Sequence, residues 1–255
     1  MTPEIRTVGD IRVQVFDLRS EPVVLDSRAW TPSVQRDPLR ADGVCLHQWD
    51  APVGTSLRNR RIFGEPEALA RRGLRVPAHI HVGVTQIGKV PVVSLAHPLE
   101  RYLYGSDAAN ATHVALEVMG VFPFTEDQRT VHHTRITPEL QAAMAVGLEL
   151  AAELLDAWAP GRTEPWELIT HRQTINGKGD HARCCGEAVV KMALEADLPL
   201  FFKPNPDRVF VPAWGRPWPA SWRRHLRESP QESPSARCPA PSSPGGSPEV
   251  PATEQ

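Results

Sequence analysis

Hydrophobic and polar positions alternate with two periods along most of the chain, one typical of strands and one typical of helices. Residues 11–18 alternate apolar and polar side chains, which predicts a half-buried strand. The short apolar run 43–47 ends in a polar cluster, which favours a central strand whose end is functional. Residues 112–119 and 167–170 predict two further strands, and the second would deliver His171.

A hairpin is predicted between residues 79 and 95. The strand-like segments 79–86 and 89–95 flank the turn Ile87-Gly88. Because proline cannot donate a ladder hydrogen bond, Pro91 predicts that the second strand lies at an edge or carries a bulge.

The most regular helical pattern follows Thr137. Threonine is a good N-cap, proline suits the first helical position, and apolar residues then recur at helical spacing up to Trp158. Residues 66–72 and 186–196 predict shorter helices. The expected fold is therefore α/β, with a mixed central β-sheet flanked by helices.

The composition changes near residue 229, where proline, serine and glycine replace nearly all large apolar residues. Such a segment cannot bury enough surface to offset the entropy of ordering, so residues 227–255 are expected to be a disordered tail. We divide the rest into an N-terminal extension, residues 1–27, and one domain, residues 28–226.

Charge and cysteine content bear on the binding partners, the redox state of the thiols and the cellular location of the chain. The net charge of −2 gives no electrostatic reason to expect a nucleic acid or a membrane surface as partner. Separately, we expect a monomer. The four cysteines lack the spacing of a disulfide scaffold, which indicates reduced thiols. No apolar stretch of a signal peptide follows Met1, so the chain is expected to be cytoplasmic, or released by a route other than the secretory signal.

Metal-capable side chains follow two of the predicted strands. His47 and His171 each end an apolar run, and Asp180 lies in the loop after His171. Adjacent strands would bring the two imidazoles together at one edge of the sheet, and two imidazoles with a carboxylate form a hydrolytic zinc site with an open fourth position. His181 and Cys184 are alternatives to Asp180, since imidazole and thiolate are both good zinc ligands.

Glu117 is an acid within the otherwise apolar strand 112–119. Alternation places Ala115, Glu117 and Met119 on one face, so this acid either faces solvent or points into a site. Beside zinc, its carboxylate would take a proton from water. Three tryptophans near the end of the domain, Trp214, Trp218 and Trp222, either stack on sugars or pack against the domain.

The order of these segments resembles the type 2 N-acetylmuramoyl-L-alanine amidases and peptidoglycan-recognition proteins over roughly residues 28–196. Val-Cys-Leu-His47 resembles the strand that ends in a zinc-binding histidine, and Thr170-His171 resembles the second ligand motif. Lys178-Gly-Asp180 resembles the Lys-x-Asp or Lys-x-Cys segment that completes the site. The remaining matches are Arg28-Ala-Trp30, Pro77-Ala-His79-Ile-His-Val, Gln86-Ile-Gly-Lys-Val, Leu95-Ala-His97 and the segment from Asn110 to Glu117.

The resemblance implies a role for each of these residues. His47, His171 and Asp180 would bind one Zn²⁺, Glu117 would be the general base and Lys178 would stabilise the oxyanion. The substrate contacts it implies are those of His79, His97 and Asn110. It implies hydrolysis of the bond between N-acetylmuramic acid and L-alanine in peptidoglycan or muropeptides. The alternatives are a non-catalytic peptidoglycan-binding module and a zinc hydrolase acting on another acylated peptide.

Overall fold

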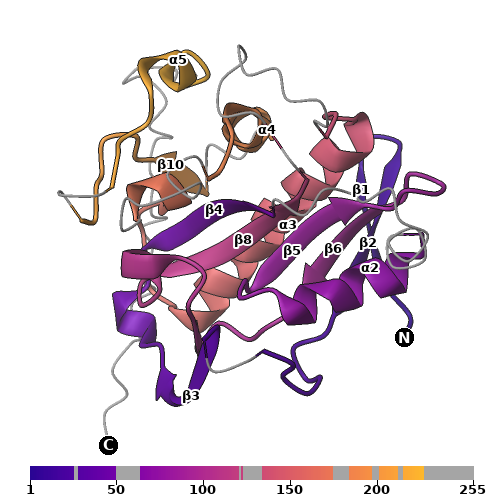
Figure 1. Cartoon of the computed structure of the whole chain (residues 1–255), viewed down its shortest axis with the longest axis horizontal. Coiled ribbons are helices and arrows are strands. Elements are labelled where there is room, and N and C mark those ends of the chain that lie inside the picture. Colours follow the sequence, from indigo (N-terminus) through magenta and orange to yellow (C-terminus); the bar gives the residue numbers. More distant parts are fainter. Residues whose placement is uncertain are drawn as a thin grey trace, which may run out of the picture.

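A mixed sheet of eight strands forms the centre of the chain (Figure 1). The computed structural model describes residues 1–25, 28–49, 64–120, 122, 134–174, 184–196, 201–211 and 215–226. In spatial order the strands are β1 (Glu4–Val8), β2 (Ile11–Asp17), β6 (Pro91–Leu95), β5 (Ile80–Val84), β8 (His113–Met119), β4 (Gly43–Trp49), β9 (Trp166–Thr170) and β10 (Phe202–Pro204).

The sheet is parallel on one side and mixed on the other. Strands β5, β8, β4, β9 and β10 run parallel, whereas β1 with β2 and β5 with β6 are antiparallel pairs. The carboxyl ends of β4, β8 and β9 therefore lie at the same edge. A second, two-stranded sheet pairs β3 (Trp30–Gln35) with β7 (Arg101–Leu103), and the polarity pattern alone did not predict it.

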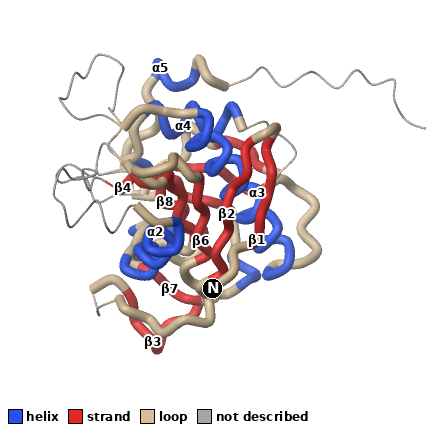
Figure 2. The backbone as a smooth tube through the Cα atoms, turned by 90° about the vertical axis from the view of Figure 1, so that its right-hand side faces the viewer, coloured by secondary structure: helices blue, strands red, loops and turns tan. Residues whose placement is uncertain are grey.

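Helices cover both faces of the large sheet, as Figure 2 shows edge-on. The long helix α3 (Pro138–Trp158) lies on one face, and α2 (Pro66–Arg72) lies on the other. The shorter helices are α4 (Glu187–Glu195) and α5 (Ala220–Arg223), with single 3₁₀ turns at η1 (Pro38–Arg40), η2 (Gly73–Arg75), η3 (Asp107–Ala109) and η4 (His171–Gln173). Among the described helices, none combines the length and the apolar character needed to cross a lipid bilayer.

Helix α3 begins where the sequence predicts. The Thr137 hydroxyl accepts the N–H of Leu140 at 3.3 Å and satisfies one of the free donors of the first turn. Its apolar side packs on the sheet so closely that a side chain at Gly147 would meet Val82 at 2.6 Å. Burial of this face supplies most of the hydrophobic core.

An apolar cluster lies under α2 on its face of the sheet. Leu69, Ala70 and Leu74 pack there on Phe16 and Met119. Beside that cluster the same face carries the polar residues His47, Glu117 and His81 at paired positions of β4, β8 and β5. This change from apolar to polar cover positions the candidate site.

The structure confirms most of the predicted elements and corrects one placement. Strand β6 lies inside the sheet between β2 and β5, so the prediction that Pro91 places it at an edge or bulge is wrong. Pro91 is the first residue of the strand and β2 pairs only from Val92, so the missing N–H interrupts no rung on that side. Trp218 and Trp222 are buried in the core, whereas Trp214 lies outside the described residues.

Strands β1 and β2, which fall in the expected extension 1–27, are part of the large sheet. The expected tail 227–255 lies outside the described residues.

Candidate metal centre

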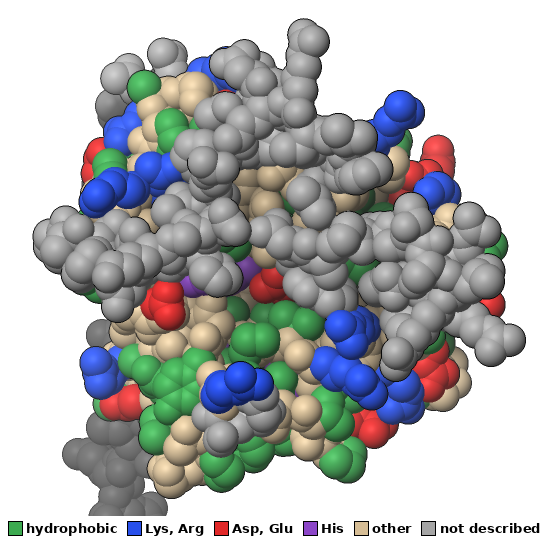
Figure 3. All heavy atoms as spheres, in the orientation of Figure 1, with side chains coloured by type: hydrophobic (Ala, Val, Ile, Leu, Met, Phe, Trp, Pro, Cys, Tyr) green, Lys and Arg blue, Asp and Glu red, His purple; other side chains and the backbone are tan. Residues whose placement is uncertain are grey.

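A row of polar side chains crosses the middle of the sheet on the α2 face. In the register of the parallel strands, His47 of β4 pairs with Glu117 of β8, and Glu117 pairs with His81 of β5. Paired positions of neighbouring strands point to the same face, so the three side chains lie side by side. All three are buried. Figure 3 shows histidine and acidic side chains meeting near the middle of this face.

His171 joins this row from the neighbouring strand. Leu46 of β4 pairs with Thr170 of β9, and His171 follows at once as the first residue of η4. The His47 and His171 rings lie with their centroids 4.2 Å apart. The prediction that adjacent strands bring the two histidines together is confirmed.

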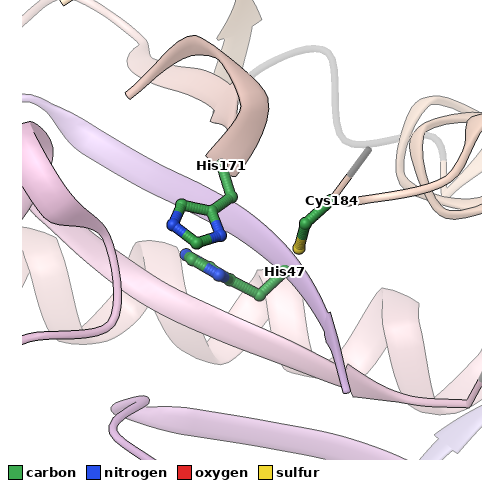
Figure 4. A group of neighbouring side chains, drawn as sticks. All are labelled: His47, His171 and Cys184. Carbon is green, nitrogen blue, oxygen red and sulfur yellow. The ribbon is translucent and has the colours of Figure 1, made fainter. Parts of the chain in front are cut away.

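Cys184 completes a group of three donors. Its Sγ accepts the N–H of Gln48 at 3.4 Å, and its carbonyl accepts the N–H of Arg172 at 2.7 Å, so it is held between β4 and η4. One ligand atom from each of His47, His171 and Cys184 lies within 4.8 Å of the other two, and all three residues are buried. Figure 4 shows the three side chains converging from separate segments.

This donor set fits zinc. Zinc takes imidazole nitrogen and thiolate sulfur at roughly 2.0–2.3 Å in a tetrahedral arrangement, so two ligand atoms of one ion lie roughly 3.3–3.6 Å apart. The three donor atoms all lie within 4.8 Å of one another, so the side chains would have to close on an ion by at most about 1.5 Å. Two imidazoles and one thiolate leave a fourth position open, as in catalytic zinc sites.

A loop before β8 supports both histidines. Ser106 Oγ lies 3.0 Å from His47 Nε2, and Asp107 Oδ2 lies 3.3 Å from His171 Nε2. Asn110, expected at the substrate, is buried, and its Oδ1 accepts the Ser106 N–H at 2.5 Å. The sequence analysis did not single out Ser106 or Asp107, although a short Ser-Asp-x-x-Asn110 segment carries them.

Gln173 fixes the turn that carries His171. Its side-chain oxygen accepts the N–H of Thr170 at 2.7 Å and the indole N–H of Trp218 at 2.8 Å. Its side-chain nitrogen donates to the Asn205 carbonyl at 2.6 Å. Gln173 is fully buried, so these bonds hold η4, and with it His171, against the end of β9.

Burial dominates the electrostatics of the site. Burial raises the pKa of the Cys184 thiol well above its usual value, and the neighbouring Cys185 and Glu117 raise it further. Burial also lowers the pKa of His81 to about 4, with a contribution from the positive charge of Arg72. The thiol and the His81 imidazole are therefore neutral at pH 7 before any metal binds.

Two other predicted histidines lie apart from the three donors. His79 Nε2 donates to the Arg101 carbonyl at 3.0 Å, and its Nδ1 accepts the Ala115 N–H at 3.2 Å. His97 is buried, and its Nδ1 accepts from Arg101 Nη1 at 2.7 Å. Hydrogen bonds within the domain therefore occupy both ring nitrogens of His79 and one of His97.

Three residues named in the sequence analysis, Lys178, Asp180 and His181, lie outside the described residues. Their roles stay predictions. Of the three alternatives for the third ligand, Cys184 is the one within the described part of the chain, and it lies beside both histidines.

A second group of metal-capable residues lies at the opposite ends of the same strands. Asp42, His113 and Glu167 bring their donor atoms within 4.8 Å of one another. The Arg208 guanidinium contacts both carboxylates, and His113 Nε2 lies 3.0 Å from Glu167. Because the Arg208 cation already pairs with both acids, the arrangement is an ion-pair network that ties the segment after β10 to the sheet.

The chain matches no protein-family model and no curated protein sequence. Its fold is similar to those of several solved structures. The endolysin N-acetylmuramoyl-L-alanine amidase LysCS from Clostridium intestinale URNW is 15% identical, covering 65% of this chain and 88% of that one, with a TM-score of 0.35. The Ph2119 endolysin from Thermus scotoductus MAT2119 bacteriophage Ph2119 is 14% identical, covering 70% and 98%, with a TM-score of 0.37. Similarity at this level is too low to assign a family, so the residues of the site itself must support any function.

Proposed function

We propose that the chain is a zinc-dependent amidase that hydrolyses the bond between N-acetylmuramic acid and L-alanine in peptidoglycan or muropeptides. The observation that supports this most is the convergence of His47, His171 and Cys184 beside the buried acid Glu117. The substrate class comes from the resemblance of the sequence segments that carry these residues to the type 2 amidases.

His47, His171 and Cys184 would hold the metal. Zinc supplies Lewis acidity, which lowers the pKa of water toward about 7 and polarises a carbonyl group. Cys184 takes the place that the resemblance gave to Asp180, because its sulfur lies within reach of both imidazoles. Asp180 stays the alternative third ligand.

Glu117 would move the proton of the reaction. Its carboxylate lies on the strand next to His47 and on the same face. A carboxylate oxygen there accepts a proton from the attacking water and delivers it to the alanine nitrogen as the amide bond breaks. Lys178 would stabilise the negative charge that develops on the carbonyl oxygen.

The buried acid favours an enzyme over a binding module. A carboxylate that is 8% exposed is costly to desolvate, and a module that only binds wall fragments has no evident need for one beside its ligand triad.

Digestion of purified peptidoglycan tests the proposal. The intact chain, supplied with zinc, is incubated with peptidoglycan, and soluble products are identified by mass spectrometry. We expect peptides that begin with a free L-alanine amino group and glycan that retains its lactyl carboxyl group. His171→Ala is expected to release neither. Zinc-loaded protein that releases no such peptides, yet sediments with the peptidoglycan, would establish the binding module instead.

A further inference from the structure

The two candidate ligand histidines are each contacted at Nε2 by neighbouring residues of one loop. Ser106 Oγ lies 3.0 Å from His47 Nε2, and Asp107 Oδ2 lies 3.3 Å from His171 Nε2. Two consecutive residues thus contact two histidines that lie on different segments, His47 in β4 and His171 just after β9. The pairing requires an unusual backbone, because Asp107 has a φ of 44°, in the left-handed region.

Several contacts fix this loop in place. Gly105 passes so close to Pro77 that a Cβ at this position would lie 2.0 Å from the Pro77 carbonyl oxygen. Asn110 Oδ1 accepts the Ser106 N–H at 2.5 Å, and the Asn110 N–H returns to the Asp107 carbonyl at 3.2 Å. Ser106 and Asn110 are both buried, which holds the side chains of 106 and 107 at the histidines.

We propose that Ser106 and Asp107 are positioning residues for the metal centre, an inference that rests on the proposed function. An oxygen acceptor at Nε2 keeps the imidazole proton there and leaves the lone pair on Nδ1. Asp107, whose carboxylate can only accept, would therefore direct His171 to ligate through Nδ1, and Ser106 would do the same for His47 when its hydroxyl accepts; the loop would set the orientation of both rings. A carboxylate in this position also makes the imidazole a stronger ligand.

In this proposal Asp107 contacts a metal ligand and is not itself one of the ligands. Its carboxylate lies beside His171 Nε2, yet among the described residues it is not one of the three donors that lie mutually within 4.8 Å. Its side chain is 45% exposed, whereas the three donors are buried. It therefore contacts the ligand from the solvent side.

Two substitutions at position 107 separate the side chain from the backbone. Glycine adopts a positive φ without strain, so Asp107→Gly removes the carboxylate and keeps the loop conformation. Asparagine tolerates the left-handed region, so Asp107→Asn keeps an oxygen acceptor and removes the charge. Ala108→Gly is the matched control, because it loosens the same turn at an exposed position. Ser106→Ala is an independent variant for His47.

The measurement is zinc affinity of the full chain by competition with a chromophoric chelator, together with the visible spectrum of the Co²⁺-substituted protein. We expect zinc to bind Asp107→Gly about 10- to 100-fold more weakly than wild type. Ser106→Ala should also bind zinc more weakly than wild type. The loss of affinity should be smaller in Asp107→Asn and absent in Ala108→Gly. The Co²⁺ ligand-field bands should shift in Asp107→Gly and return toward wild type in Asp107→Asn.

Two different failures are distinguishable. If wild type binds zinc, but Asp107→Gly and Ser106→Ala stay within twofold of Ala108→Gly, the positioning role is wrong and the proposed function stands. If wild type binds neither zinc nor Co²⁺, the metal centre itself is wrong, and the proposed function and this inference fall together.

Discussion

His47 and Glu117 are register-paired residues on neighbouring parallel strands, and both side chains point to the same face of the sheet. This pairing puts a candidate metal ligand and a candidate proton acceptor about one strand spacing apart, roughly 4.8 Å between backbones. Because the register of two buried strands is strongly specified, the separation is a property of the core rather than of a loop.

Replacing Glu117 by glutamine is expected to abolish most turnover while leaving the metal in place. The amide is nearly isosteric with the carboxylate but cannot accept the proton of the attacking water, and general-base catalysis contributes about 10²- to 10⁴-fold. Hydrolysis rate and zinc content are measured on the same preparation. A Glu117→Gln protein with near wild-type turnover would show that another group is the base.

The adjacent thiols Cys184 and Cys185 provide a matched pair for the third ligand. Both are buried, but only Cys184 belongs to the group of close donors. We expect Cys184→Ala to weaken zinc binding at least about 100-fold and Cys185→Ala to keep it, since loss of one of three protein ligands removes a large part of the affinity. Chelator competition measures both.

The substitution Asp180→Ala decides whether Cys184 or Asp180 is the third zinc ligand. If Cys184 is the ligand, Asp180→Ala binds zinc as wild type does. If Asp180→Ala loses zinc and Cys184→Ala binds it fully, the ligands are His47, His171 and Asp180, as the family resemblance implies.

Gly43→Ala is expected to destabilise the domain strongly. An added Cβ would lie 1.9 Å from the backbone oxygen of Glu167, so β4, which carries His47, and β9, which ends just before His171, would have to move apart. Overpacking against rigid backbone costs about 3 kcal/mol or more of unfolding free energy. Denaturant unfolding measures it.

Gly83→Ala is the control, since its added Cβ would meet side-chain atoms and no backbone: Met119 Cβ at 3.2 Å, Met119 Cε at 3.3 Å and Leu69 Cδ2 at 3.5 Å. We expect a cost of about 1 kcal/mol there, because those side chains can shift. Equal losses in the two variants would mean that β4 and β9 are not held at this distance.

Acid is expected to destabilise the fold before the carboxylates titrate. Burial lowers the pKa of His81 and of His97 to about 4. Between pH 6.5 and 4 the unfolded chain binds more protons than the folded one, so the unfolding free energy falls as pH falls. For the fully buried His81 the loss approaches about 3 kcal/mol. Thermal unfolding from pH 7 to pH 4 measures this, and a constant midpoint would contradict the neutral, buried state of these histidines.

Local patterns predicted the elements that position the site, because their signals are local. The Thr137 cap and the apolar spacing after it specify α3, and the apolar run before His47 specifies β4. The pairing of β3 with β7 depends on contacts between distant segments, which no single window contains.

The residues around the candidate ligands were harder to predict, because their positions also depend on contacts between distant segments. Ser106 and Asp107 reach the histidines only through a positive φ and a loop tied down by Asn110. Cys184 stood among three alternatives in sequence, and only its contacts with the segments around Gln48 and Arg172 put its sulfur beside His47 and His171.

The zinc content of the purified chain, by elemental mass spectrometry, tests the central claim most directly. We predict about one zinc per chain in wild type and loss of that zinc in His171→Ala, because two imidazoles and one thiolate leave too few ligands when one is removed. A wild-type protein that contains no zinc and takes up none when it is added would contradict the metal centre.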